Sequence, residues 1–246
     1  MIYTAQRGRD VYGIPIGIIV MDCVIPYPPG TPGNARTFDH PVIYSVVKGA
    51  DMENLIYNPK PDLVERFIEA GRELVRQGAK AIVGNCGFMV LFQREMAVAL
   101  PVPVFMSGLL QLPLIRQGLR PDQSIGIISA SGTSLTKRHM EIACWGTEVP
   151  VTIRGLEQKP AFKAAIHDQV GTLDFEAVEA EVVSEALSIQ RDHPDTGAIL
   201  LECTDLPPYA EAVQRSTGLP VFDITSLIQW AVAGAERKHF PHHVTR

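Results

Sequence analysis

The sequence predicts an α/β protein of two pseudo-symmetric, Rossmann-like lobes, each with a parallel sheet flanked by helices, and an active site in the cleft between them. Apolar runs alternate with amphipathic segments along the 246 residues, which is typical of parallel strands joined by helices. The apolar runs are uninterrupted, as expected of strands covered on both faces. Two of them end in Cys86 and Cys203, and Pro-Val-Phe follows each cysteine at the same spacing, at 103–105 and 220–222.

The first half contains a strand at each apolar run and a helix at each amphipathic one. Pro61 favours the start of a helix and Gly78 its end. The expected order is a strand at 13–21, a Pro/Gly-rich loop at 22–41, a helix at 61–78, a strand at 81–85, a helix at 92–100, a strand at 102–106 and a helix at 107–118.

The second half repeats this order, with the boundary in the stretch 116–123, so we expect lobes at 1–117 and 118–246. The final helix is expected to pack back on the first lobe. The expected elements are a strand at 124–129, a helix from about 134, a strand at 149–153, a helix at 175–192, a strand at 198–202, an intervening helix, a strand at 219–223 and a helix at 226–238.

The composition favours a cytoplasmic globular protein. Apolar residues make up 46% and charged residues 20%, which allows a sizeable core. The net charge of −5 argues against nucleic acid or an anionic membrane as partner. No apolar stretch approaches the roughly 20 residues that span a bilayer, and the N-terminus lacks the apolar segment of a signal peptide. A homodimer is the default expectation for the oligomeric state.

The four cysteines are far apart and lack zinc-site spacing, and no dinucleotide, Walker or metalloprotease motif is present, so we expect no metal and no cofactor. Cys23 and Cys144 have no matched partner and are interpreted as small buried apolar residues. The matched placement of Cys86 and Cys203 instead favours a functional pair at the carboxyl ends of two strands, where ligands bind in such folds.

Two stretches of the second half carry a family resemblance. They are Cys203-Thr204-Asp205-Leu206-Pro207 and Ser129-Ala130-Ser131-Gly132-Thr133. Together with one cysteine per lobe, they resemble the aspartate/glutamate racemase superfamily over essentially the whole chain. The resemblance implies a two-lobed fold and proton transfer by two cysteines without a cofactor.

The first half is similar to a particular subgroup. Amino-acid racemases usually follow the first cysteine with Asn-Thr, whereas Gly87 and Phe88 follow Cys86 here. The stretches 27–30, 38–41 and 85–89 resemble the algal dimethylsulfoniopropionate lyases of the superfamily and their bacterial relatives. That departure makes an amino-acid substrate less favoured.

The expected chemistry is proton transfer at the α carbon of a small carboxylate. A free thiol titrates near about 8.5, and amides at a helix N-terminus would favour the thiolate. One cysteine would remove a proton and the other deliver one. Racemisation is the default outcome; β-elimination of dimethylsulfoniopropionate to dimethyl sulfide and acrylate, or non-catalytic binding of a small acid, are the alternatives.

Residues around the cysteines are candidates for binding and assistance. Neutral donors would hold the carboxylate, and aromatic faces would favour a sulfonium. An aromatic residue at the position of Phe88 is more often part of the core than of a pocket, whereas Tyr27 can equally lie in the pocket or on the surface. Asp22 and Asp205 are candidate assistants or helix caps, and Glu202 has no assigned role. The substrate-binding candidates are Asn85, Gly87, Phe88, Ser131, Gly132, Thr133, Thr204 and Tyr27.

Overall fold

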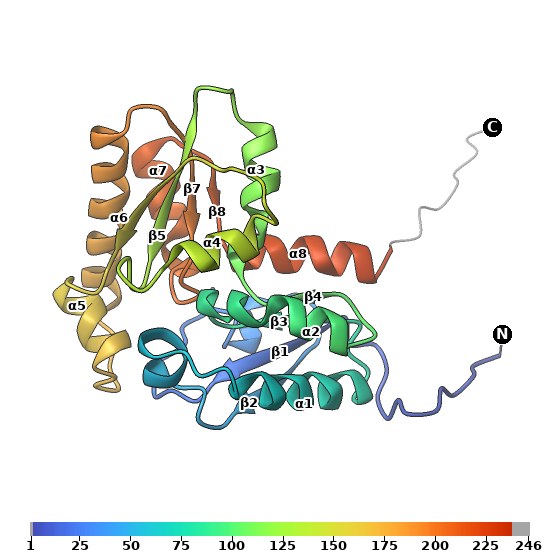
Figure 1. Ribbon diagram of the computed structural model, residues 1–246. Coiled ribbons are helices and arrows are strands. Elements are labelled where there is room, and N and C mark those ends of the chain that lie inside the picture. Colours follow the sequence, from blue (N-terminus) through green and yellow to red (C-terminus); the bar gives the residue numbers. More distant parts are fainter. Residues whose placement is uncertain (1, 238–246) are drawn as a thin grey trace, which may run out of the picture.

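Two lobes, each built on a four-stranded parallel sheet, make up the protein in the computed structural model, which describes residues 2–237 (Figure 1). The strand orders match, β2-β1-β3-β4 in the first sheet and β6-β5-β7-β8 in the second. The predicted α/β fold with two similar lobes is therefore confirmed. The strands are β1 Ile16–Met21, β2 Val42–Val47, β3 Ala81–Gly84, β4 Val104–Phe105, β5 Ser124–Ser129, β6 Val151–Gly155, β7 Thr196–Leu201 and β8 Val221–Phe222.

Helices cover the sheets, as the crossovers between parallel strands require. The α-helices are α1 Leu63–Arg76, α2 Gln93–Ala99, α3 Leu112–Gly118, α4 Lys137–Ala143, α5 Pro160–Phe162, α6 Phe175–Asp192, α7 Ala210–Thr217 and α8 Ile224–Ala235. Short 3-10 turns are η1 Ala35–Thr37, η3 Gly87–Phe92, η4 Gly108–Gln111 and η6 Pro207–Tyr209. Two π-helical turns are η2 Glu53–Tyr57 and η5 Lys163–His167.

Strand β2 was not anticipated from the sequence. It lies at the edge of the first sheet, paired in parallel with β1 only. Its residues are mostly half-buried, although its Val-Ile-Tyr-Ser-Val-Val run is rich in β-branched residues, which favour strands. The helical segments η2, α5 and η5 were not predicted either. The segment expected as one helix at 107–118 begins with the 3-10 turn η4 before α3.

Helix α8 returns from the second sheet to pack on the first (Figure 1). Its apolar side, including Ile224 and Ile228, joins Ile16 and Ile18 of β1 in one buried cluster. The helix starts at Ile224 because the Asp223 carboxylate accepts hydrogen bonds from the first-turn amides. The expected helix at 226–238 thus begins two residues early, and its last residue lies outside the described part of the chain.

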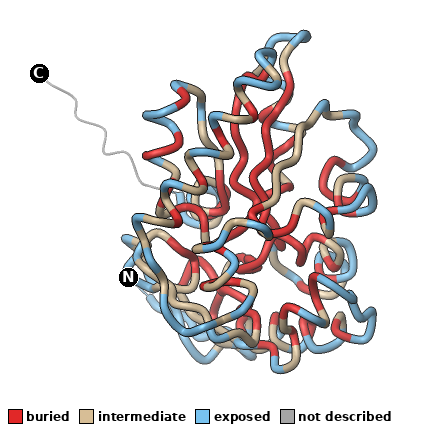
Figure 2. The backbone as a smooth tube through the Cα atoms, turned by 90° about the vertical axis from the view of Figure 1, so that its left-hand side faces the viewer, coloured by how far each residue is buried: buried red, intermediate tan, exposed pale blue. Residues whose placement is uncertain are grey.

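The two lobes share buried apolar surface. Buried segments run through both sheets in Figure 2. One continuous cluster includes Leu112 and Ile115 of α3 together with Ile125 of β5 and Ala198 of β7. Apolar contact of this kind holds the lobes together and brings the carboxyl ends of their strands into one region.

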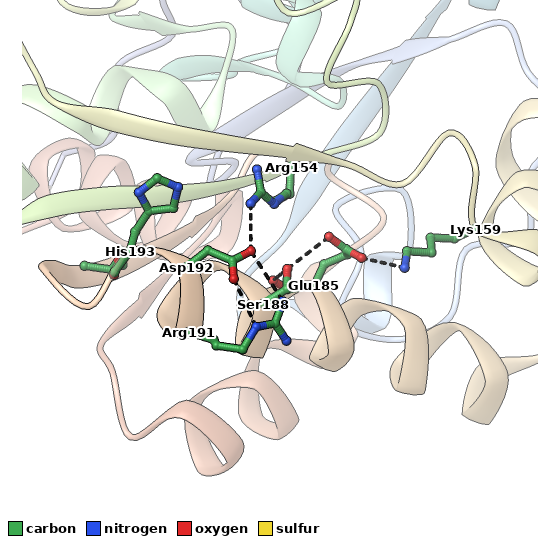
Figure 3. A network of polar contacts seen from close by, with 8 residues as sticks. Arg154, Lys159, Glu185, Ser188, Arg191, Asp192 and His193 are labelled. Atoms are coloured by element: carbon green, nitrogen blue, oxygen red, sulfur yellow. Dashed lines mark hydrogen bonds and ion pairs between the residues drawn. The ribbon is translucent and has the colours of Figure 1, made fainter.

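A polar network on the outside of the second lobe ties α6 to β6 and the loop after it (Figure 3). Arg154 pairs with Asp192 at 3.2 Å, and Lys159 pairs with Glu185 at 2.5 Å. Partly exposed ion pairs contribute about 0–1 kcal/mol each. None of these side chains lines a cavity that is described below, so the network belongs to the scaffold.

Candidate active site

Both matched cysteines line one enclosed cavity between the lobes. Cys86 follows β3 and Cys203 follows β7, so each lies at the carboxyl end of a central strand. Both are buried, with 7% of each residue exposed. The cavity has a volume of about 20 Å³, room for roughly one water molecule. A small acid can enter only when the segments around the thiols move apart.

Burial dominates the electrostatics of the two thiols. It raises the pKa of Cys86 well above that of a free thiol, and the nearby Glu202 raises it further. Burial likewise raises the pKa of Cys203, with Asp205 and Glu202 adding to the effect. Amide donors of the expected kind are present, from Phe88 to Cys86 and from Asp205 to Cys203. Their effect is smaller than that of burial, so both thiols are protonated in this closed arrangement.

Asp205 is the hydrogen-bond partner of Cys203. The Cys203 thiol donates to Asp205 Oδ2 at 3.6 Å, while Oδ1 is buried and has no partner in the described structure. Burial raises the pKa of the Asp205 carboxyl to about 7. A carboxyl group in this position can take the proton of the thiol near neutral pH.

Glu202 is fully buried in the same cavity wall. Its Oε2 accepts a hydrogen bond from Ser129 Oγ at 2.7 Å, and its Oε1 has no partner among the described residues. Burial raises the pKa of this carboxyl to about 7. Glu202 had no role predicted from the sequence, although it is the one charged residue in the apolar run 198–203.

Gly87 is required by the position of Glu202. A Cβ atom added at Gly87 would lie 1.8 Å from Glu202 Oε1, a distance that no side chain tolerates. The residue after Cys86 is therefore small because a carboxylate from the other lobe lies against its Cα. The Glu202 backbone carbonyl, at 2.7 Å from the same added Cβ, restricts the space as well.

Asn85 connects the two lobes at the cavity. Its side-chain oxygen accepts from the Met21 amide at 2.9 Å, and its side-chain nitrogen donates to Tyr27 Oη at 3.4 Å. The Thr204 hydroxyl donates to the Asn85 backbone carbonyl. Burial raises the pKa of the Tyr27 phenol, so it remains neutral. Asn85, Tyr27 and Thr204, all expected at the site, line the cavity.

Phe88 lines the cavity and also packs in the core. Its ring meets His139 edge-to-face, with centroids 5.2 Å apart. Burial lowers the pKa of His139 to about 4, so that imidazole is neutral. Phe92, four residues on, stacks on Phe67. Of the two aromatic residues after Cys86, only Phe88 reaches the cavity.

The Ser131–Thr133 loop does not line the cysteine cavity. Its donors instead hold an internal carboxylate: the Gly132 amide lies 3.1 Å from Glu157 Oε2, and the Thr133 amide and hydroxyl lie 3.3 Å from Oε1. Thr133 borders a larger neighbouring cavity of about 650 Å³. The loop has the donors expected of a carboxylate-binding segment, and Glu157 engages them.

Asp22 also lies away from the cavity lining. Its carboxylate pairs with Lys48 at 3.1 Å and accepts from the Gly49 amide at 3.1 Å. These hydrogen bonds lower its pKa. Cys23 is half-buried, and burial together with the charge of Asp205 raises its pKa to about 12. Neither residue contacts the enclosed space in this arrangement.

No group of three metal-ligating side chains gathers anywhere in residues 2–237. Within the same range, no helix combines the length and apolar character that a bilayer crossing demands. All four cysteines are free thiols. The described site thus consists of thiols, carboxyl groups and neutral donors.

Comparison with known proteins finds no matching family model, but several similar curated proteins. A dimethylsulfoniopropionate lyase of Durusdinium sp. clade D is 34% identical over 216 residues, covering 85% of this chain and 70% of that protein. Dimethylsulfoniopropionate lyase 3 of Emiliania huxleyi is 35% identical over 217 residues, and the match covers 85% of this chain. The chain spans 56% of the length of that second relative.

Solved structures share the fold at low sequence identity. A mutant of arylmalonate decarboxylase superposes with a TM-score of 0.61 and 20% identity, covering 89% of this chain and 92% of that one. An aspartate racemase of Picrophilus torridus superposes with a TM-score of 0.58 and 14% identity, covering 90% and 94%. These two enzymes therefore share the two-lobed architecture of this chain.

Proposed function

Because this chain belongs to the family of dimethylsulfoniopropionate lyases within the aspartate/glutamate racemase superfamily, we propose that it removes the α proton of a small onium carboxylate and eliminates the group on the β carbon. The observation that carries this proposal is one enclosed cavity lined by two thiols, one of which is hydrogen-bonded to a carboxyl group. The sequence alone favours racemisation as the default outcome. The names of the relatives favour elimination instead.

Cys203 is the proposed base, since it is the thiol with a hydrogen-bonded carboxylate. Asp205 takes the thiol proton, and the resulting thiolate takes the proton from the α carbon of the substrate. The electron pair of that C–H bond forms the α–β double bond, and the β C–S bond breaks with its electrons on sulfur. With dimethylsulfoniopropionate, the products are dimethyl sulfide, acrylate and one proton. The α proton restores the Cys203 thiol, and Asp205 releases the proton that it had taken to solvent.

Cys86 and the neutral groups complete the proposed site. Asn85 and Thr204 lie at the cavity as donors for the substrate carboxylate once the lobes separate. Cys86 is a protonated thiol from the other lobe. It can polarise the substrate or, after α-proton removal, return a proton to the carbanion.

Racemisation or isomerisation is the second candidate. It is favoured by the same pair of thiols, since both line one cavity from opposite lobes. A chiral acid without a leaving group on its β carbon would exchange its α proton there instead of eliminating. A cavity that only binds small acids would do neither.

Three readouts separate these functions: dimethyl sulfide in the headspace, deuterium from solvent in recovered substrate, and loss of optical activity in chiral amino and hydroxy acids. We expect dimethyl sulfide from dimethylsulfoniopropionate. Cys203→Ser and Cys86→Ser should each lower the rate by about 10²-fold or more, while Cys144→Ser, at a buried free thiol outside the cavity, should not. Full activity in both active-site variants would refute the two-thiol mechanism.

A further inference from the structure

The walls of the cysteine cavity carry acidic groups and no basic ones. Among the described residues that line it, Glu202 and Asp205 are the carboxyl groups, and there is no Lys, Arg or His. A second carboxylate on a substrate would meet like charge without a counter-ion, whereas a cation would meet opposite charge. Such a wall discriminates by the sign of the charge it admits.

The two carboxyl groups differ in their hydrogen-bond partners. Asp205 accepts from the Cys203 thiol, which ties it to the proton transfer. Glu202 is held through Oε2 by Ser129 at 2.7 Å, and its Oε1 is buried without a partner beside Gly87. One oxygen is thus fixed by the second lobe, and the other lies unengaged at the contact between the lobes.

We propose that Glu202 is the specificity-determining residue of the site and that it receives the cationic head of an onium carboxylate, a sulfonium or quaternary ammonium acid. This assignment rests on the proposed function for the location of the substrate. Tyr27 and Phe88 line the same space and present aromatic faces, which attract such cations. Methyl groups around the charge also suit the apolar side chains of Met21 and Met52 in the lining.

The cation would also act on the thiols. In the closed structure the charge of Glu202 raises the pKa of both Cys86 and Cys203. A positive group beside Glu202 offsets that charge and lowers the pKa of each thiol toward the thiolate. An onium acid would therefore assist its own deprotonation, and a neutral acid of the same shape would not.

The test compares two acids that differ only in charge: 3-(trimethylammonio)propanoate and its carbon isostere 4,4-dimethylpentanoate. Their binding is measured by titration calorimetry at pH 8 on the wild-type protein, on Glu202→Gln and on Glu211→Gln. The control removes a charge from an exposed ion pair of the same lobe. Neither acid needs to be turned over, so the result is independent of whether the chain releases dimethyl sulfide.

The wild type and the control should bind the ammonium acid at least about tenfold more tightly than its isostere, as expected for a desolvated charge contact. In Glu202→Gln the two acids should bind within about threefold of each other. A preference that survives in this variant, or that is absent from the wild type, would overturn the assignment.

A second measurement needs no variant. Glu202 is charged at pH 8 and largely neutral at pH 5.5, since burial raises its pKa to about 7. The preference of the wild type for the ammonium acid should therefore fall at least about threefold between these pH values. The facing groups are Asp205, which gains a proton over the same range, and the thiols Cys86 and Cys203, which stay protonated. A preference independent of pH would contradict the proposal.

Discussion

Replacing Glu202 by Gln should change how the stability of the protein depends on pH. The buried carboxyl has a pKa of about 7, against an ordinary 4.5, because burial penalises its charged form. The folded state therefore holds this proton more tightly than the unfolded chain does. The contribution of this proton to the free energy of unfolding is fully present below pH 4.5 and is lost as pH rises through 7. Gln has nearly the same shape and cannot ionise.

The size of the effect follows from the two pKa values. A rise from 4.5 to about 7, at ~1.4 kcal/mol for each tenfold change in proton affinity, amounts to ~3 kcal/mol lost at alkaline pH. About 2–3 kcal/mol of that loss falls between pH 5 and pH 8. The difference in the free energy of unfolding between Glu202→Gln and the wild type should widen by this amount, in favour of the variant.

Urea unfolding at pH 5 and pH 8 measures this difference directly. Glu211→Gln is the matched control, because Glu211 is exposed and paired with Arg215. The difference in the free energy of unfolding between Glu211→Gln and the wild type should be nearly the same at both pH values. Asp205 titrates in all three proteins and cancels to first order. A change of under about 0.5 kcal/mol between the two pH values for Glu202→Gln would refute the burial argument.

Three further substitutions test contacts around the cleft, each read from the urea midpoint. Gly87→Ala places a methyl group 1.8 Å from Glu202 Oε1 and should cost about 1–3 kcal/mol; an unchanged midpoint would contradict that packing. Thr204→Val removes the hydroxyl bonded to the buried Asn85 carbonyl and should cost about 1–3 kcal/mol, whereas Thr204→Ser should cost less. Tyr57→Phe removes the hydroxyl that lies 2.5 Å from His167 Nδ1 and should cost about 0.5–1.5 kcal/mol. Tyr12→Phe, which removes an exposed hydroxyl that accepts from the Gln6 amide, is the control.

The sequence by itself determined the fold of two similar α/β lobes and the family to which the chain belongs. Uninterrupted apolar runs predict covered parallel strands, and the repeated spacing after Cys86 and Cys203 indicates two similar halves. Ligand sites at the carboxyl ends of parallel strands follow from topology alone. That is why both cysteines, with Asn85, Thr204 and Asp205 beside them, were recognisable as candidates. The edge strand β2 was not predicted, although its Val-Ile-Tyr-Ser-Val-Val run favours a strand.

Only the tertiary structure decided the electrostatics of the site. Whether a thiol is charged depends on how deeply it is buried and on which charged groups lie beside it. The burial of both thiols and the approach of Glu202 to Cys86 come from the packing of the two lobes, whereas the carboxyl groups that act on Cys203 are its sequence neighbours. The contact of Gly87 with the Glu202 carboxyl forms only where the two lobes pack together. The Ser131–Thr133 loop was predicted to bind the substrate carboxylate, but its donors bind Glu157, which is distant in sequence. Contacts between segments far apart in sequence therefore determine which candidates face the cavity.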